Sequence, residues 1–230
     1  MKSNYLFCIG VLSAVLSIGA IAASPAQAQF QVRVGYNAGV INNINEGEAA
    51  LTNPGATISA FSSFSVINFG PGGIGGGSNF PDGRSGTDDF VLEALGRLTF
   101  NTAGAYVFRV TSDDGFRLRT GVDAMGAGGA TYSEFFGQRA SGSTDGAVFA
   151  ALSGSLLDTR LTYFERGGGE DVELSYSLEG GAFQIVGSTS DITVSAIPAA
   201  TVPEAGTVGL MLTGCAGMLG VMIRRRGAKK

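Results

Sequence analysis

The sequence predicts an all-β protein, an antiparallel β-sandwich with Greek-key-like connections. Glycine is abundant, with 37 of 230 residues, and charged residues make up only 15%. Glycine is costly inside helices and useful at turns, so this composition favours a turn-rich β fold. In the second half of the chain, short apolar runs recur about every ten residues and are separated by Gly and Ser, which is typical of sandwiches and barrels. We expect one domain at residues 29–200, because the residues at both ends of the chain resemble targeting and sorting signals that do not belong to the folded domain.

The first half of the domain is predicted to begin with one strand and to continue with two apolar stretches, at residues 56–69 and 90–100, which are separated by loops. Residues 30–36 alternate, which places Gln31 and Arg33 on the more polar face of a strand. Residues 37–54 are polar and predict a solvated loop. The glycine-rich run at residues 70–77 lacks the Lys-Ser/Thr of a phosphate-binding loop, so it predicts a flexible loop and no nucleotide site.

The pattern around which the rest of the domain is arranged lies at residues 103–121. Apolar side chains recur at every second position on both sides of a Ser-Asp-Asp-Gly corner; they are Tyr106, Phe108, Val110, Phe116 and Leu118. This alternation predicts a β-hairpin. Gly115 permits a backbone conformation that other residues avoid.

The second half of the domain is predicted to hold a long loop and then five strands. Residues 121–146 are rich in glycine and polar residues and predict a long insert. The strands are expected at residues 147–152, 156–165, 171–178, 182–187 and 191–197. Roughly 50 residues separate the hairpin from the late strands that would pair with it. This separation implies Greek-key-like, non-local pairing.

Composition excludes several kinds of chemistry. Histidine is absent, and Cys8 and Cys215 lie in the terminal apolar segments. The domain therefore has no disulfide, no imidazole base and no His or Cys metal site, and any metal must be held by oxygen, which points to calcium first. Residues 29–203 contain nine arginines, no lysine and eighteen acidic residues, a net charge of −9. Such a domain is a poor partner for nucleic acid.

The N-terminus predicts export. Residues 1–28 combine Lys2, an apolar run and the small residues Ala26 and Ala28, which mark a signal-peptide cleavage site after Ala28. The alternative is an uncleaved anchor helix. We expect the protein to be exported through the inner membrane.

The C-terminus has three parts. A linker at residues 201–206 carries Val202, Pro203 and Glu204, residues 207–223 are mostly apolar and predict a transmembrane helix, and residues 224–230 form a basic tail. The tail begins with Arg224, Arg225 and Arg226.

This three-part layout resembles the PEP-CTERM protein-sorting signal. The resemblance implies processing near the motif by an exosortase, and a final place at the cell surface or in the extracellular matrix, with a transient or retained C-terminal membrane anchor. A plain C-terminal membrane anchor is the alternative.

Three motifs in the domain carry a second resemblance. They are Gly-Ala-Tyr-Val-Phe at residues 104–108, Ser-Asp-Asp-Gly at 112–115, and Tyr-Phe-Glu at 163–165. In this order they resemble the carbohydrate-binding β-sandwich named after the anthrax protective antigen. In sugar-binding members, two adjacent aspartates joined by a cis peptide bond hold a calcium ion that coordinates sugar hydroxyls. The resemblance assigns that role to Asp113 and Asp114.

Further ligand-binding residues are expected in the loop after the hairpin. Asp123 and Asp145 are candidates for additional oxygen contacts. Tyr132, with Phe135 and Phe136, is a candidate for an aromatic sugar platform, and packing into the core is the alternative for these side chains. The alternative for the corner is structural, because Asp-Asp-Gly also makes a tight turn by capping its own backbone.

A second acidic group, Glu165 to Glu173, alternates with apolar residues and predicts the wet face of a strand, not a glycosidase carboxylate pair. The sequence thus predicts an exported, non-enzymatic protein that binds exopolysaccharide or a cell-surface sugar with the help of calcium. The alternative is a structural matrix or adhesion protein of the cell envelope with no specific small ligand.

Overall fold

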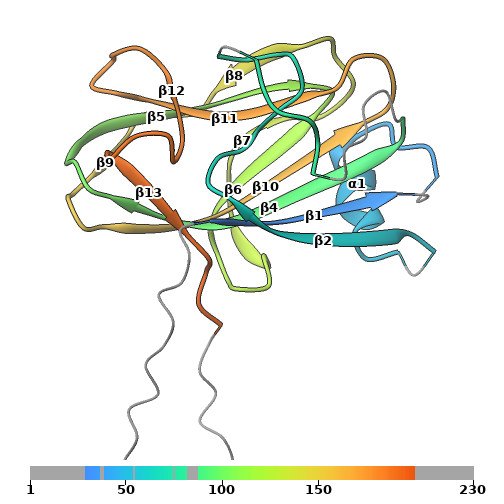
Figure 1. The fold of residues 1–230 in the computed structure, drawn as a ribbon, viewed down its shortest axis with the longest axis horizontal. Coiled ribbons are helices and arrows are strands. Elements are labelled where there is room, and N and C mark those ends of the chain that lie inside the picture. The colour runs from blue at the N-terminus through green and yellow to red at the C-terminus, as the bar shows by residue number, and fades with distance from the viewer. Residues whose placement is uncertain (1–28, 37–38, 54, 75, 82–87, 200–230) are drawn as a thin grey trace, which may run out of the picture.

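The computed structural model of the chain describes residues 29–36, 39–53, 55–74, 76–81 and 88–199. Two antiparallel sheets face each other across one large apolar core (Figure 1). The all-β sandwich predicted from the sequence is therefore confirmed. The predicted signal peptide at 1–28, with Ala26 and Ala28, and the sorting segments at 201–230 lie outside the described residues. Within the described ranges, none of the helices combines the length and apolarity needed to cross a bilayer.

The first sheet has the strand order β2-β1-β4-β10-β6-β7, with β13 also paired to β4. Its strands are β1 (Phe30–Tyr36), β2 (Thr57–Phe64), β4 (Phe90–Phe100), β6 (Phe116–Val122), β7 (Gly128–Phe135), β10 (Leu156–Glu165) and β13 (Ile192–Ser195). Strand β1 pairs with residues 91–95 of β4, and β13 pairs with residues 97–100 of the same strand. The first and last described strands therefore pair with successive segments of β4.

The second sheet has the strand order β12-β11-β5-β8, with β3 paired to β11 and β9 paired to β5. Its strands are β3 (Asn68–Phe69), β5 (Gly104–Asp113), β8 (Gly142–Asp145), β9 (Phe149–Ala151), β11 (Asp171–Leu178) and β12 (Gln184–Ile185). The pairing of β5 with β11 joins residues that are far apart in sequence, from Asp113 with Asp171 to Tyr106 with Leu178, so it is non-local as the sequence predicts.

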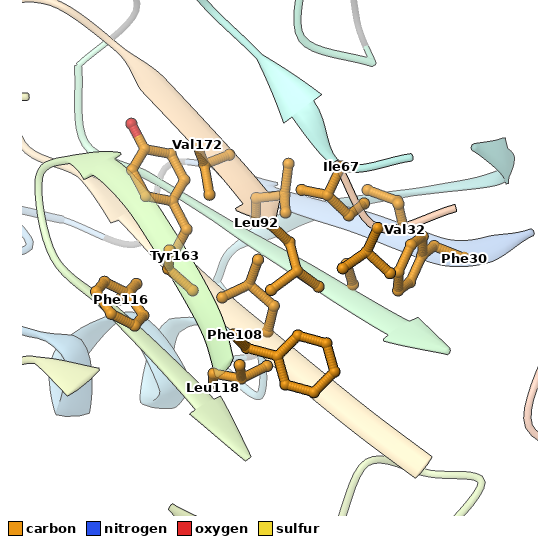
Figure 2. Packing of buried hydrophobic residues seen from close by; sticks show 14 of the residues in the cluster. Phe30, Val32, Ile67, Leu92, Phe108, Phe116, Leu118, Tyr163 and Val172 are labelled. Carbon is orange, nitrogen blue, oxygen red and sulfur yellow. The ribbon is translucent and has the colours of Figure 1, made fainter. Parts of the chain in front are cut away.

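The core consists of the alternate, inward-facing side chains of both sheets (Figure 2). Phe108 and Val172 of the second sheet lie opposite Leu92, Leu118 and Tyr163 of the first, and all five are almost fully buried. This burial of apolar area is the main driving force for the fold.

The predicted hairpin at 103–121 is wrong, although its two strands exist. Strand β5 belongs to the second sheet and β6 to the first, so the Ser-Asp-Asp-Gly corner carries the chain across the sandwich. Phe108 and Phe116 both face the core. Alternation assigns the face of each strand correctly, but it does not reveal which strand lies beside it.

The solvated loop predicted at 37–54 contains helix α1 (Ile44–Ala50). The Asn43 side chain accepts hydrogen bonds from the backbone N–H groups of Asn45 and Glu46, and Glu46 accepts one from Asn42, which together cap the helix start. A Cβ at Gly47 would lie 3.2 Å from Phe164 Cβ, so the helix packs closely on the outer face of β10.

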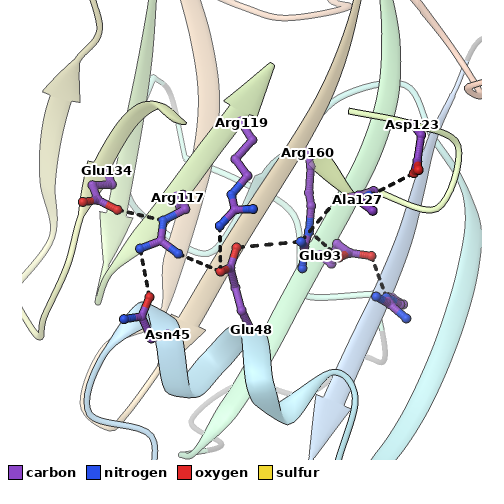
Figure 3. Close-up of polar contacts among 11 residues, drawn as sticks. Asn45, Glu48, Glu93, Arg117, Arg119, Asp123, Ala127, Glu134 and Arg160 are labelled. Atoms are coloured by element: carbon purple, nitrogen blue, oxygen red, sulfur yellow. Dashed lines mark hydrogen bonds and ion pairs between the residues drawn. The ribbon is translucent and has the colours of Figure 1, made fainter. Parts of the chain in front are cut away.

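Arginines and glutamates form a network on the same outer face, beneath α1 (Figure 3). Arg117 pairs with Glu48 of α1 at 2.6 Å and with Glu134 at 2.7 Å. Glu93 is only 1% exposed and pairs with Arg33 and Arg160, each at 2.6 Å. The polar face of the first sheet is therefore covered and cross-linked, not simply wet.

Two further loop predictions also need correction. The insert at 121–146 contains β7 and β8, which extend opposite sheets. The glycine-rich run after β3 is a loop, as predicted, but it is held in place: the Gly70 N–H donates to Ser78 O at 2.9 Å across the loop, and the Ile74 N–H donates to the Glu173 carboxylate of β11 at 2.5 Å.

Candidate metal centre

The corner between β5 and β6 is tightly enclosed. The Asp113–Asp114 peptide bond is cis, and the Ser112 hydroxyl donates to Asp114 O at 2.6 Å. A Cβ at Gly115 would lie 2.5 Å from the Phe164 ring and 2.6 Å from Gly137 O, so only glycine fits. The corner is thus built into the sandwich and is not a free surface turn.

Three carboxylates meet at this corner. Oxygens of Asp113, Asp114 and Glu165 all lie within 4.8 Å of one another. Strand β10 pairs with β6 and ends beside the corner, which brings Glu165 there from 51 residues further along the chain. Asp114 is 4% exposed and Glu165 is 1% exposed.

Backbone amides orient the two buried carboxylates. Asp114 Oδ1 accepts from the Arg139 N–H and Oδ2 from the Arg166 N–H, both at 2.9 Å. Glu165 Oε1 accepts from the Gly167 N–H at 2.6 Å. A carboxylate oxygen has two lone-pair sites, so each of these oxygens keeps capacity for a cation. The loops at 136–141 and 166–170 therefore surround and fix the cluster.

Tyr163 connects the cluster to the core. Its hydroxyl contacts Asp113 O and lies 2.7 Å from Glu165 Oε2. Its ring packs against Phe80 and Phe90 between the sheets. The position of Glu165 is consequently set by core packing.

The electrostatics of the cluster favour a positive partner. Burial, together with the charge of Asp114, raises the pKa of Glu165 to about 8. Burial and the neighbouring Asp114 and Asp171 also raise the pKa of Asp113. Both shifts mean that the folded protein disfavours full ionisation of the cluster, and a bound divalent cation would relieve this.

Arg139 supplies a nearby positive charge without filling the cluster. Its guanidinium group donates to Ser112 O at 3.1 Å and to Ser112 Oγ at 2.9 Å, and it lies 4.4 Å from the centre of the Phe135 ring. The arginine thus braces the corner from the side.

Three of the residues predicted to bind ligand are engaged elsewhere. Asp123 follows the far end of β6, about 20 Å along the strand from the corner, where its carboxylate accepts from the Met125 and Ala127 N–H groups (Figure 3). Asp145 lies opposite Arg109 on the next strand and forms a two-bond ion pair with it, at 2.6 and 2.9 Å.

Tyr132 is part of the core. Its ring contacts Phe108 and Phe149, and its hydroxyl contacts the Phe108 N–H and Ala147 O. The structure therefore brings Asp113 and Asp114 together but places Asp123, Asp145 and Tyr132 away from them.

Sequence reasoning assigned Glu165 to a wet strand face and so missed the third carboxylate. Leu161 and Tyr163 face the core, and Glu165 continues their alternation onto the same side. That period of two was the available signal. Asp171 and Glu173, also predicted to be wet, are 3% and 1% exposed, because loops cover the outer face of β11.

Comparison with solved structures identifies the fold. The chain is similar to the PA14 domain of the MpAFP antifreeze protein, with 18% identity, a TM-score of 0.54, and coverage of 78% of this chain and 98% of that one. It is also similar to the A domain of epithelial adhesin 6 from Candida glabrata, in complex with Galβ1-3GlcNAc, with 12% identity, a TM-score of 0.53 and coverage of 76% and 89%. The A domain of epithelial adhesin 9 from the same organism, in complex with Galβ1-4GlcNAc, matches at 12% identity and a TM-score of 0.52, covering 80% and 96%.

These likenesses show that the described part of the chain has the fold of the protective-antigen-type (PA14) β-sandwich. No protein-family model matches the sequence, and no curated protein matches it either.

Proposed function

We propose that this protein is a calcium-dependent glycan-binding module that acts outside the cell. The observation that carries the proposal is the meeting of Asp113, Asp114 and Glu165 at one enclosed corner of a PA14-type sandwich. The likeness to adhesin domains in complex with Galβ1-3GlcNAc and Galβ1-4GlcNAc supports the same conclusion. The module binds its glycan and does not transform it.

The donor set fits calcium. Calcium prefers six to eight hard oxygen ligands in flexible geometry, and the cluster offers three carboxylates. The residues that would hold the ion are Asp113, Asp114 and Glu165. A bound ion would supply coordination positions for sugar hydroxyls. The chain's own part is to fix the carboxylates, through the Arg139, Arg166 and Gly167 amides, before the ligand arrives.

Thermal melting with calcium and with chelator tests the metal site. Calcium at a hundred times its Kd stabilises the folded state by about 2.7 kcal/mol, which corresponds to a rise of roughly 5–10 °C in Tm. Asp113→Ala should remove this rise. Asp145→Ala is the matched control, because it also removes an acid from the second sheet. An equal calcium response in both variants would contradict the metal assignment.

A glycan array in calcium buffer tests the ligand class. The array should include Galβ1-3GlcNAc, Galβ1-4GlcNAc and exopolysaccharide from the producing cells. We expect retention that chelator abolishes. A protein that binds calcium but retains none of these glycans would be a structural component of the cell envelope or matrix.

We also propose that the protein is exported and sorted at its C-terminus. The sequence supports this through the signal peptide at 1–28 and the motif Val202, Pro203 and Glu204, followed by an apolar segment and Arg224, Arg225 and Arg226. Intact mass measurement of the protein recovered from the producing cells tests it. Loss of residues 1–28 and of the chain beyond the motif is expected, and a full-length mass for all of the protein would refute processing at both ends.

A further inference from the structure

Two buried side-chain oxygens lie beneath the glycine-rich run without a hydrogen-bond partner among the described residues. They are Oδ1 of Asn68, on β3, and Oε1 of Glu173, on β11. Glu173 is only 1% exposed. Buried polar groups in folded proteins are almost always hydrogen-bonded, and buried charges are almost always paired or bound to a metal. Both oxygens therefore have capacity for a further ligand.

The two side chains that carry these oxygens are neighbours. Asn68 and Glu173 are direct partners in the antiparallel pairing of β3 and β11. Directly opposed residues lie on the same face of a sheet, with Cβ atoms about 4.5–5.5 Å apart. Phe69 and Val172, the adjacent residues, belong to the core. A carboxylate and a carboxamide thus lie beside each other on the outer face of the second sheet.

The glycine-rich run closes over the carboxylate. The Ile74 N–H donates to Glu173 Oε2 at 2.5 Å, and a Cβ at Gly73 would lie 2.4 Å from the same oxygen. Only glycine allows this approach. One oxygen of Glu173 is therefore bound to the loop, and the other is buried and remains available.

The same run closes over the carboxamide. Asn68 Nδ2 donates to Gly76 O at 3.3 Å, which fixes the orientation of the amide. A Cβ at Gly77 would lie 2.7 Å from both Asn68 Oδ1 and Gly70 O, so these two oxygens approach the same point. Gly70 O accepts one hydrogen bond, from the Gly77 N–H at 2.6 Å, and keeps a second lone pair. A pocket partly lined by Gly70 and Gly77 provides a route from solvent.

No positive side chain neutralises Glu173. Within the described part of the chain Glu173 forms no ion pair, and Arg109 of β5 is engaged in its two-bond ion pair with Asp145. Thr111, opposite Glu173 on the other side of β11, has its hydroxyl bonded to Ser143 Oγ at 2.8 Å. A cation would supply the missing charge, which a water molecule would not.

We propose that Glu173 Oε1, Asn68 Oδ1 and the carbonyl oxygen of Gly70 bind a second calcium ion, which holds the glycine-rich run on β11. All three are hard oxygen donors of the kind that calcium prefers. Calcium affinity rises with the number of charged ligands. One carboxylate serves here and three meet at the corner, so this ion binds at least about a hundredfold more weakly. The inference does not depend on glycan binding.

Calcium titration of the full chain by equilibrium dialysis counts the ions. We expect the wild type to bind two, Asp113→Ala to keep only the weaker and Glu173→Gln to keep only the tighter. Glutamine retains an acceptor for the Ile74 N–H, so Glu173→Gln should fold. Glu134→Gln, on edge strand β7, is the matched control and should bind both ions.

A second variant tests the carboxamide by a gain in affinity. Asn68→Asp places a second carboxylate beside Glu173 and should tighten the weaker calcium site about tenfold. Hydrogen exchange then locates the ion: in Asp113→Ala, calcium should slow exchange of the Ile74 amide about tenfold or more, and in Glu173→Gln it should have no effect there.

The possible failures are distinguishable. Two ions bound by Glu173→Gln, or unchanged affinity in Asn68→Asp, would overturn the second site. A single ion in the wild type that Asp113→Ala abolishes would show that Glu173 holds only water or a proton, and would leave the corner site standing. If Asp113→Ala keeps both ions, the corner assignment fails, and the loss of one ion in Glu173→Gln would still support the second site.

Discussion

Replacing Glu165 with glutamine should make the calcium-free protein more stable than the wild type at high pH and abolish part of its response to calcium. The substitution removes one of three crowded carboxylates and keeps the shape of the side chain. Glutamine can still accept from the Gly167 N–H and donate toward the Tyr163 oxygen, so both contacts of the wild-type carboxylate are retained. The charge is the main property that changes.

The magnitude follows from the pKa of Glu165. Burial raises this pKa to about 8, from 4.5 in the unfolded chain. Because the folded state favours the protonated form, the stability that Glu165 contributes is fully present below pH 4.5 and is lost as the pH rises through 8. The difference between these two pKa values corresponds to at most roughly 5 kcal/mol of unfolding free energy, and relaxation of the buried site lowers the expected loss to about 3 kcal/mol.

Chemical denaturation between pH 5 and pH 9 in chelator measures this effect. The wild type should lose free energy of unfolding across the range, and Glu165→Gln should lose about 3 kcal/mol less. Glu134→Gln, on edge strand β7, controls for the loss of a charge. At pH 8, calcium should stabilise the wild type more than Glu165→Gln, since the ion replaces the missing proton.

Two results would refute this reasoning. A pH dependence of Glu165→Gln that matches the wild type would show that Glu165 does not titrate in this range. An undiminished calcium response would show that its carboxylate is not among the oxygen donors.

Three other predictions concern the framework of the site. Gly115→Ala should cost about 2–4 kcal/mol in unfolding free energy, because its Cβ would overlap Phe164, whereas Gly137→Ala, with open space around it, should be neutral in the same melts. Glu93→Gln should cost roughly 3 kcal/mol by denaturation, since it removes the buried negative charge that Arg33 and Arg160 face. Asp158→Asn, in a more exposed pair, should cost about 1 kcal/mol or less, and equal costs would contradict the assigned role of burial. Asp123→Ala should lower stability by about 1–2 kcal/mol through loss of two turn hydrogen bonds, yet leave the calcium-induced rise in Tm intact; a lost rise would return Asp123 to the metal site.

The candidate site was predictable in part. Asp113 and Asp114 are adjacent in the chain, so their proximity required no knowledge of the fold. Glu165 required knowing that β10 ends beside the corner, which is a contact between residues 51 apart. The alternation through Leu161 and Tyr163 indicated the correct face, but a charged residue in that series was interpreted as solvent-exposed.

The helix and the two strands missed in the predicted loops share a physical cause. Helix α1 has seven residues and begins at a side-chain cap, so its apolar stripe is too short to show a period. Strand β7 is mostly exposed and rich in glycine, and it is a strand because β6 offers it a partner. These segments adopt regular structure because of their tertiary contacts, and the local sequence preference for helix or strand was too weak to predict them.

Local order in the chain was enough to establish several properties of this protein. The period-two alternation determined which side chains face the core, the lack of histidine and of cysteine in the domain restricted any metal to oxygen donors, and Asp-Asp-Gly marked the corner. Only the tertiary structure decided that the corner crosses between sheets, that Glu165 joins it, and that Asp123, Asp145 and Tyr132 make their contacts away from it. The physical reason is that the residues next to a side chain in sequence determine which face of the strand it occupies. Whether the outer face of that strand is also buried, and which group a charged side chain contacts on it, depends on segments that are distant in sequence.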